Sequence, residues 1–365
     1  MTAPAFDPRE LEIVRRVPAL LAGRPDSLIY NFPVTPREAF NGVYTKEPIW
    51  QIIGNGVEGK LFTPGVNPDN VARAFVFDGT FIPGVSNKTG GKDMFGIEWE
   101  YVLQVGGSMV RPGKPLLEDA NEWVDKVVWP DIESWDWEGC QKANEQYLNS
   151  DNFITCMFLN GWYERLISFM EFEGAIIAVI DEDQKDAVKD FMEKLSDLYI
   201  RILDKYMAYF PNIDCFCMHD DWGSQKDTFF SPETASEMIV PYMKKVTDFL
   251  HTKGKYCELH SCGQLLKQVP NIIAAGWDSW NPQAMNDTHQ IYELYGDKLL
   301  IGVLPEKFDP LLTTEEDQRE MAKAYADKFC RPDKPSLWNM YGWEMLTPEF
   351  SEELYKQSRI NYNRK

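Results

Sequence analysis

The chain has 365 residues, of which 44% are hydrophobic and 26% are charged, and its formal net charge at pH 7 is −20. A chain this long and this apolar can bury a full core, which excludes an intrinsically disordered protein. The acidity argues against nucleic-acid and anionic-membrane partners, because such partners are bound by basic patches.

The sequence gives no sign of export or of a membrane span. Its longest apolar run covers residues 175–180, far short of the roughly 18 residues that indicate a transmembrane helix. Residues 1–16 contain early acidic side chains and lack the apolar centre of a signal peptide. The seven cysteines are an odd number, which favours thiols over a disulfide framework. We therefore expect a cytoplasmic protein, and a homo-oligomer is compatible with the sequence.

In the first half of the chain, apolar segments at residues 48–53 and 74–77 predict strands. Residues 99–112 contain two apolar runs that flank Gly106 and Gly107, a pattern typical of a β-hairpin.

The second half alternates between strand-like and helical patterns. The predicted strands are residues 153–159, 213–219, 255–260, 277–280, 298–304 and 336–340. The predicted helices are a stretch after Gly161, residues 185–210, 232–253 (with a kink at Pro241), 264–275, 288–295 and 314–329, and a last helix that starts at Thr347 and Pro348.

This alternation predicts an α/β protein with a parallel sheet. Together with the two upstream strands it predicts a (β/α)8 TIM barrel, whose chemistry lies at the carboxyl ends of the strands. The barrel would be one domain over residues 1–365, with an N-terminal extension at 1–47 and a hairpin-bearing insertion at 80–130. A doubly wound open sheet is the alternative.

Residues 54–59 spell G-x-G-x-x-G after a predicted strand, with Asp78 about 20 residues further on, as in a dinucleotide site. That motif needs a helix to open at the second glycine. Here Pro64, Gly65 and Pro68 follow instead, so we disfavour a nucleotide site.

A second cluster has metal-ligand chemistry. Glu258, His260 and Cys262 alternate along a predicted strand and its exit, so their side chains lie on one side. Carboxylate, imidazole and thiolate are all zinc ligands. A histidine and a thiol packed in the core at a strand end remain the alternative.

Other polar residues follow predicted strands. Asp220 and Asp221 would serve as general acid or base or as a substrate anchor, or else would belong to a loop that caps the next helix. Asn160 and Asn281 are smaller instances of the same pattern.

The stretch HSCGQLLKQVPNIIAAGWDSWNP, followed by IYELYGDKLLIGVL, resembles the uroporphyrinogen decarboxylase superfamily, and so do HDDWGSQKDTFFSPETASEMIVPYMKKVTDFLHTKG and DMFGIEWE. The resemblance implies a (β/α)8 barrel and one of two chemistries. Decarboxylases of the family hold substrate carboxylates with an RQAGR segment and use no metal. The cobalamin-linked branch contains zinc methyltransferases that exchange methyl groups with a corrinoid protein and have H-x-C as two zinc ligands.

The residues favour the second branch. Residues 51–56 stand where RQAGR is expected and contain no arginine, while H-x-C is present as His260 and Cys262. The thiol-methylating members have a further cysteine ligand after the last strand, but residues 337–343 contain none. Either Glu258 or a neighbouring carboxylate would then complete the site, or no metal binds.

A corrinoid would have to arrive on a partner protein. Asp287 and His289 begin a D-x-H-x-x-G corrinoid signature, but Tyr292 stands where the glycine is required.

We therefore hypothesise a corrinoid-dependent methyltransferase of the O-demethylase type, with zinc as Lewis acid. Aromatic residues near predicted strand ends, among them Trp222, Trp338 and Tyr341, favour a methoxylated aromatic substrate. Asp220 and Asp221 would be catalytic, and Asn160 and Asn281 would contact the substrate. A metal-independent decarboxylase and a non-catalytic ligand-binding relative remain the alternatives.

Overall fold

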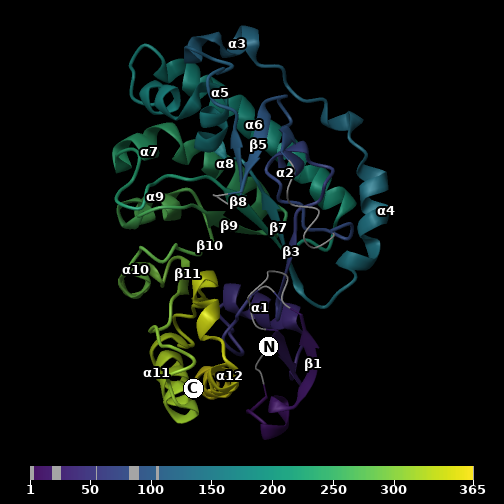
Figure 1. Ribbon diagram of the computed structural model, residues 1–365, viewed down its shortest axis with the longest axis vertical. Helices are drawn as coiled ribbons and strands as arrows, with labels where there is room; N and C mark the ends of the chain where they lie inside the picture. The colour runs from purple at the N-terminus through teal and green to yellow at the C-terminus, as the bar shows by residue number, and fades with distance from the viewer. Residues whose placement is uncertain (1–3, 19–25, 55, 82–89, 104–106, 365) are drawn as a thin grey trace. The chain divides into compact units, whose positions relative to one another are not determined.

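Figure 1 shows the computed structural model, which describes residues 4–18, 26–54, 56–81, 90–103 and 107–364. The chain forms two units: unit 1 contains Met1–Lys60, Asp151–Ile154 and Asp278–Lys365, and unit 2 contains Leu61–Ser150 and Thr155–Trp277. None of the helices within the described ranges is long and apolar enough to cross a membrane.

Strands and helices alternate along the second half of the chain, as the sequence predicts. The elements are β7 (Phe153–Phe158), α5 (Trp162–Ala178), α6 (Lys185–Tyr209), β8 (Cys215–His219), α7 (Pro232–Met238), α8 (Val240–Thr252), β9 (Tyr256–His260), α9 (Val269–Ala274), β10 (Ser279–Trp280), α10 (Thr288–Tyr295), β11 (Leu300–Val303), α11 (Glu315–Phe329), β12 (Leu337–Trp338) and α12 (Pro348–Tyr362).

The order of the strands separates the two predicted architectures. In unit 2 the order is β3 (Gly59–Phe62), β7, β8 and β9, and in unit 1 it is β10, β11 and β12. The pairings β7–β8, β8–β9, β10–β11 and β11–β12 are all parallel. A doubly wound sheet reverses its strand order at a switch point, whereas a barrel keeps neighbours in chain order. The predicted (β/α)8 barrel class is therefore confirmed.

The two strands predicted upstream are wrong. Residues 48–53 form no strand, although Ile52 accepts a hydrogen bond from the Trp338 amide at 2.9 Å and so runs beside β12. Gly54 and Gly56, at φ +100° and +92°, turn the chain before β3 begins. Residues 74–77 form only an isolated bridge between Phe77 and Thr63.

The same turn also explains why the glycine-rich segment is not a phosphate site. The Gly54 amide donates to the Glu58 carboxylate at 3.0 Å, and Trp50 Nε1 donates to the other oxygen at 2.8 Å. The amide that a phosphate would use is already bound to an acid. The helix that follows, α2 (Pro68–Ala72), is five residues long.

Several other predicted bounds shift. The predicted helix 232–253 is divided at Ile239, two residues before Pro241, where the sequence predicts a kink. The predicted helix 264–275 is reduced to a 3₁₀ turn at Leu266–Gln268 and to α9. After β12 the predicted strand gives way to a 3₁₀ helix, Met340–Met345.

The predicted hairpin is confirmed. β5 (Glu98–Val102) pairs antiparallel with β6 (Gly107–Val110), and β4 (Gly91–Lys92) pairs with β5. Gly106, one of the two predicted turn residues, lies outside the described residues. The insertion also contains α3 (Trp123–Lys126) and α4 (Trp137–Leu148). The N-terminal extension holds a second antiparallel pair, β1 (Ile13–Val17) with β2 (Ser27–Tyr30), and α1 (Pro36–Tyr44).

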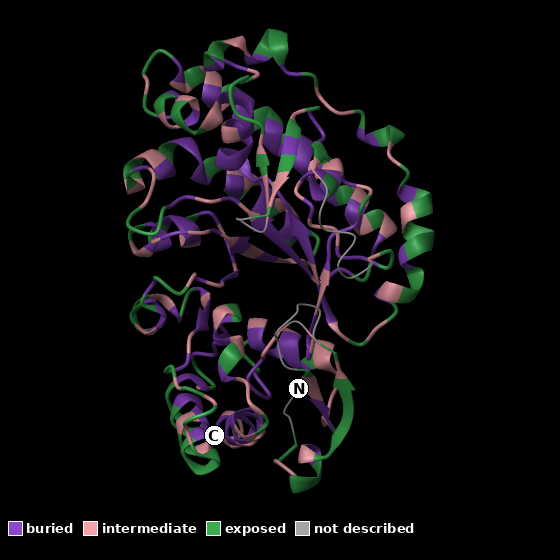
Figure 2. Ribbon diagram, in the orientation of Figure 1, coloured by how far each residue is buried: buried purple, intermediate pink, exposed green. Residues whose placement is uncertain are grey.

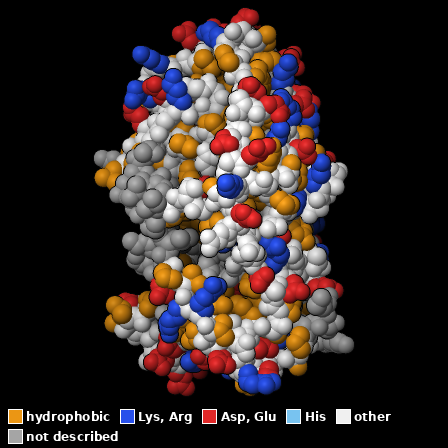
Figure 3. Space-filling view, turned by 90° about the vertical axis from the view of Figure 1, so that its right-hand side faces the viewer, with side chains coloured by type: hydrophobic (Ala, Val, Ile, Leu, Met, Phe, Trp, Pro, Cys, Tyr) orange, Lys and Arg blue, Asp and Glu red, His pale blue; other side chains and the backbone are white. Residues whose placement is uncertain are grey.

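The predicted apolar face of α6 forms part of the core of unit 2. Its buried residues are Val188, Phe191, Met192, Leu195, Ser196, Leu198, Tyr199, Ile202, Leu203 and Tyr206. Figure 2 shows β7, β8 and β9 buried, with exposed residues on the outer sides of the helices. All seven cysteines are free, as expected. On the face in Figure 3, acidic and basic side chains are interspersed, so the net acidity is not gathered there into one patch.

A buried ion cluster joins the insertion to α5 within unit 2. Arg165 donates to Asp93 at 2.7 Å and also pairs with Asp69, and all three side chains are fully buried. Asp69 and Asp93 also accept backbone hydrogen bonds from Met94 and Phe95. The insertion is therefore held by charges that have no access to water.

Arg165→Leu should destabilise the protein by about 3–5 kcal/mol, because two buried carboxylates lose their cation. Urea denaturation followed by tryptophan fluorescence measures this. The control is Arg201→Leu, which removes an exposed arginine 3.8 Å from Glu133 and should cost only a small fraction as much. Equal losses in the two variants would contradict the structural role of the cluster.

Candidate metal centre and active site

The register between β8 and β9 places two histidines side by side. His219 pairs with His260, and Cys217 pairs with Glu258, in parallel register. Directly opposite side chains of neighbouring strands point the same way. The two imidazole rings accordingly stack, with centroids 4.5 Å apart and planes inclined by 26°. Both lie at the carboxyl ends of their strands, where barrel chemistry is found.

The three metal ligands predicted from the sequence divide between two levels of the sheet. His260 Nε2 lies 3.6 Å from Cys262 Sγ, so the fold brings these two donors together. Glu258 lies one pleat deeper, where its Oε1 is 3.6 Å from Cys217 Sγ.

The sequence predicts no role for His219, yet this residue belongs to the cluster. One ligand atom each from His219, Asp221 and His260 lie within 4.8 Å of one another. Asp221 Oδ1 also accepts a hydrogen bond from the Cys262 amide at 2.6 Å, which ties the loop after β8 to the loop after β9. The available sequence signal was that His219 ends a predicted strand directly before two aspartates.

Glu164, at the start of α5, contacts His219, and Arg73 contacts Glu164 in turn. Glu164 Oε2 lies 2.7 Å from His219 Nδ1, and its other oxygen lies 3.4 Å from the Arg73 guanidinium. Arg73 also donates to Asn160 Oδ1 at 2.7 Å. These contacts hold Nδ1 of His219 against a carboxylate and leave Nε2 as its remaining donor atom.

The pKa values of the two stacked histidines are shifted in opposite directions. Burial, together with neighbouring His219, lowers the pKa of His260 to about 3. Burial also acts to lower the pKa of His219, but Glu164 outweighs it and the net shift is upward. Burial would raise the pKa of Glu164, yet His219 and Arg73 hold that pKa at about 2. His260 is thus a neutral imidazole, the form that binds metals.

The adjacent aspartates have different surroundings. Asp220 is fully buried and accepts hydrogen bonds from the Glu164 amide and from Trp222 Nε1, both at 2.9 Å. Burial and the nearby Glu164 raise its pKa to about 7. Asp220 therefore caps the first turn of α5, with both oxygens engaged, while Asp221 is half-buried beside Cys262.

The other predicted substrate contacts lie in unit 1. Asn281 Nδ2 donates to the Trp338 carbonyl at 3.4 Å, and Asn281 Oδ1 accepts from the Met340 amide at 3.0 Å. The Trp338 ring packs against Tyr325 and Phe350, on helices α11 and α12. Tyr341 lies in the 3₁₀ helix that follows β12. Asn281 thus ties the end of β10 to the end of β12.

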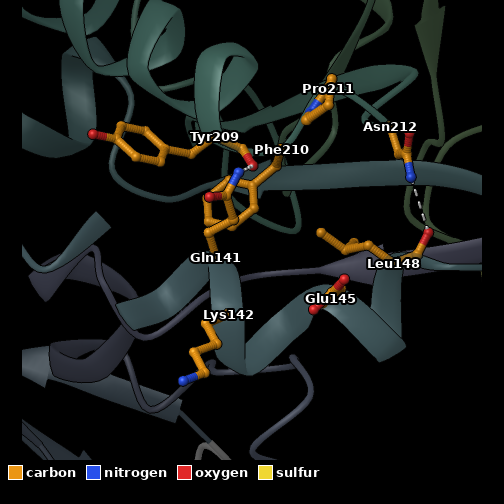
Figure 4. A pocket seen from close by; sticks show the side chains of 8 residues that line it. All are labelled: Gln141, Lys142, Glu145, Leu148, Tyr209, Phe210, Pro211 and Asn212. Carbon is orange, nitrogen blue, oxygen red and sulfur yellow. Dashed lines mark hydrogen bonds between the residues drawn. The ribbon is translucent and has the colours of Figure 1, made fainter. Parts of the chain in front are cut away.

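A surface cavity of about 370 Å³ lies elsewhere in unit 2 (Figure 4). It is lined by α4 and by residues 209–212, which directly precede β8. Gln141 and Asn212 donate hydrogen bonds across it to the carbonyls of Tyr209 and Leu148. This is the amino end of β8, so the cavity does not adjoin the histidine cluster.

The donor spacing in the cluster suits zinc. A thiolate at about 2.3 Å and an imidazole nitrogen at about 2.0–2.1 Å from one tetrahedral ion lie roughly 3.6 Å apart. His260 Nε2 and Cys262 Sγ have that separation. Imidazole, thiolate and carboxylate are all zinc donors, so the residues present fit the metal.

Comparisons with known proteins agree with this geometry. The family described as Uroporphyrinogen decarboxylase (URO-D) matches residues 172–335, which include β8, β9 and both histidines. This part of the chain is therefore similar to the uroporphyrinogen decarboxylase family. The predicted resemblance is thereby confirmed. A search of curated proteins gave no significant match.

One solved structure supports the fold. A methyltransferase from Methanosarcina mazei is similar with a TM-score of 0.56 and 13% identity, over 90% of this chain and 99% of that one. An endo-beta-1,4-mannanase from Thermotoga petrophila has a TM-score of 0.34 and 10% identity, over 86% and 77% of the chains. The IolI protein with a bound zinc atom has a TM-score of 0.28 and 11% identity, over 64% and 83%. Only the first likeness is close enough to support the fold.

Gly161→Ala should disturb the junction between α5 and β8. An added Cβ would lie 2.5 Å from Asp220 Cβ and 2.8 Å from the His219 carbonyl, so we expect a loss of about 1–3 kcal/mol. Urea denaturation checks this. The control is Gly107→Ala, whose Cβ meets nothing within 4 Å. A Gly161→Ala variant as stable as the control would show that this close approach does not constrain the site.

Proposed function

We propose that this protein is a zinc methyltransferase that removes a methyl group from a small methylated substrate and passes it to a corrinoid protein. The observation that carries the proposal is the 3.6 Å separation of His260 Nε2 and Cys262 Sγ at the carboxyl end of β9. The family match over residues 172–335 and the fold similar to that of a methyltransferase support it.

The residues of the cluster would have two roles, metal binding and either substrate orientation or proton transfer. His260 and Cys262 would hold zinc, and Asp221, half-buried beside Cys262, is placed to orient the substrate or to protonate the leaving group. When bound, zinc would supply Lewis-acid chemistry to the substrate atom that releases the methyl group, and the partner's corrinoid would accept that group. Asp220 is a weaker candidate for proton transfer, since both its oxygens are engaged.

We favour a methoxylated aromatic compound, with Asn160, Trp222, Asn281, Trp338 and Tyr341 as its predicted contacts. The acidic chain has no arginine in residues 51–56, which disfavours a porphyrinogen with many carboxylates, because like charges repel.

Metal analysis tests the zinc site. Purified protein should contain near-stoichiometric zinc, and the His260→Ala/Cys262→Ala double variant should lose it, since two donors disappear. A matched double variant, Cys140→Ala/His289→Gln, removes a thiol and an imidazole from outside the cluster and should keep the metal. Metal-free protein that retains activity would contradict the proposal and favour a decarboxylase.

Methyl transfer tests the reaction itself. With reduced cobalamin and a panel of methoxylated aromatics, we expect methylcobalamin to form in the wild-type protein, followed by its absorption spectrum. The Cys140→Ala/His289→Gln variant should behave like wild type. Failure of every panel member would reject the substrate class.

A further inference from the structure

The sequence predicts Glu258 as the third zinc ligand, but Glu258 does not lie at the level of His260 in the sheet. Glu258 is two residues earlier on β9, and successive strand residues are about 3.3 Å apart, so it lies roughly one pleat deeper. Its carboxylate there contacts Cys217. A donor at the level of His260 must therefore come from another element.

β8 supplies such a donor. His219 is the register partner of His260, its ring stacks on the His260 ring, and its ligand atom lies within 4.8 Å of those of His260 and Asp221. Two nitrogens on one tetrahedral zinc lie about 3.4 Å apart. The ligand atoms of the two histidines lie within 4.8 Å of one another, so binding one ion needs them to approach by at most about 1.4 Å.

The contacts of His219 also match those of a metal-bound histidine. Metal-ligating histidines usually donate their other ring nitrogen to a carboxylate, which fixes the tautomer and the ring orientation. His219 Nδ1 lies 2.7 Å from Glu164, and Glu164 is held in turn by Arg73. These three residues come from distant parts of the sequence, and their side chains are only 11–16% exposed.

We propose that His219 is the third protein ligand of the zinc site, through Nε2, and that Glu164 is the positioning residue that orients its ring. This inference rests on the proposed function, because it assumes zinc at His260 and Cys262. It replaces Glu258 in the predicted ligand set. Three protein ligands leave the fourth position open for substrate, as in catalytic zinc sites, with Asp221 beside it.

The test is zinc affinity, measured by competition with a chromophoric chelator. His219→Asn keeps a donor where Nδ1 meets Glu164 but has no atom at Nε2, so it separates ligation from packing. We expect the zinc affinity of His219→Asn to fall by more than about 100-fold. Glu164→Gln removes only an orienting partner, so its zinc affinity should fall by about 10–100-fold. His289→Gln is the matched control and should bind like wild type.

Cobalt substitution gives a second readout that does not depend on activity. Cobalt in the wild-type protein should show a thiolate charge-transfer band and intense d–d bands. In His219→Asn the charge-transfer band should persist at high cobalt, because Cys262 remains, while the d–d bands change as a nitrogen ligand is lost. If His219→Asn fails to fold by circular dichroism, Glu164→Gln carries the test alone.

The outcomes separate the two proposals. Unchanged zinc affinity and an unchanged cobalt spectrum in His219→Asn, with zinc lost in His260→Ala/Cys262→Ala, would overturn the role of His219 and leave the proposed function standing. Absence of zinc binding by the wild-type protein would overturn both.

Discussion

The site depends on the parallel register between β8 and β9. That register sets His219 opposite His260, and a shift of one residue would turn one ring to the other face of the sheet. The loops that follow are tied together at the same level, since the Asp220 amide donates to the His260 carbonyl and the Cys262 amide to Asp221. Two imidazoles, a thiol and a carboxylate thus lie together at the carboxyl ends of β8 and β9.

Burying so many polar side chains together costs free energy of folding, which suggests that the cluster serves a function. The buried His260 ring stacks on His219, His219 Nδ1 lies 2.7 Å from Glu164, and Arg73 contacts Glu164 in turn. Buried polar groups are expensive unless they are all paired. Arg73 and Glu164, which are far apart in the sequence, together orient the single imidazole of His219. Such a network of buried charged groups is expected at a functional site.

Local patterns in the sequence could predict much of this architecture. The periodicity of α6 indicated its buried face, and the two-residue spacing of His260 and Cys262 indicated donors that converge. The strand predicted at 48–53 is wrong because apolar character does not reveal where Gly54 and Gly56 turn the chain, and residues 74–77 form only the bridge between Phe77 and Thr63. His219 was missed because register between strands is a property of the assembled sheet. Asp220 and Asp221, adjacent in sequence, received equal roles, yet one caps α5 and the other lies beside the thiol.

Zinc K-edge X-ray absorption on the metal-loaded protein tests the central claim most directly, because it counts donor types around the ion. One sulfur at about 2.3 Å and two imidazole nitrogens at about 2.0–2.1 Å, with a further light donor, is the predicted shell. A shell with two or more sulfurs, or with oxygen donors alone, would contradict a site built from His219, His260 and Cys262.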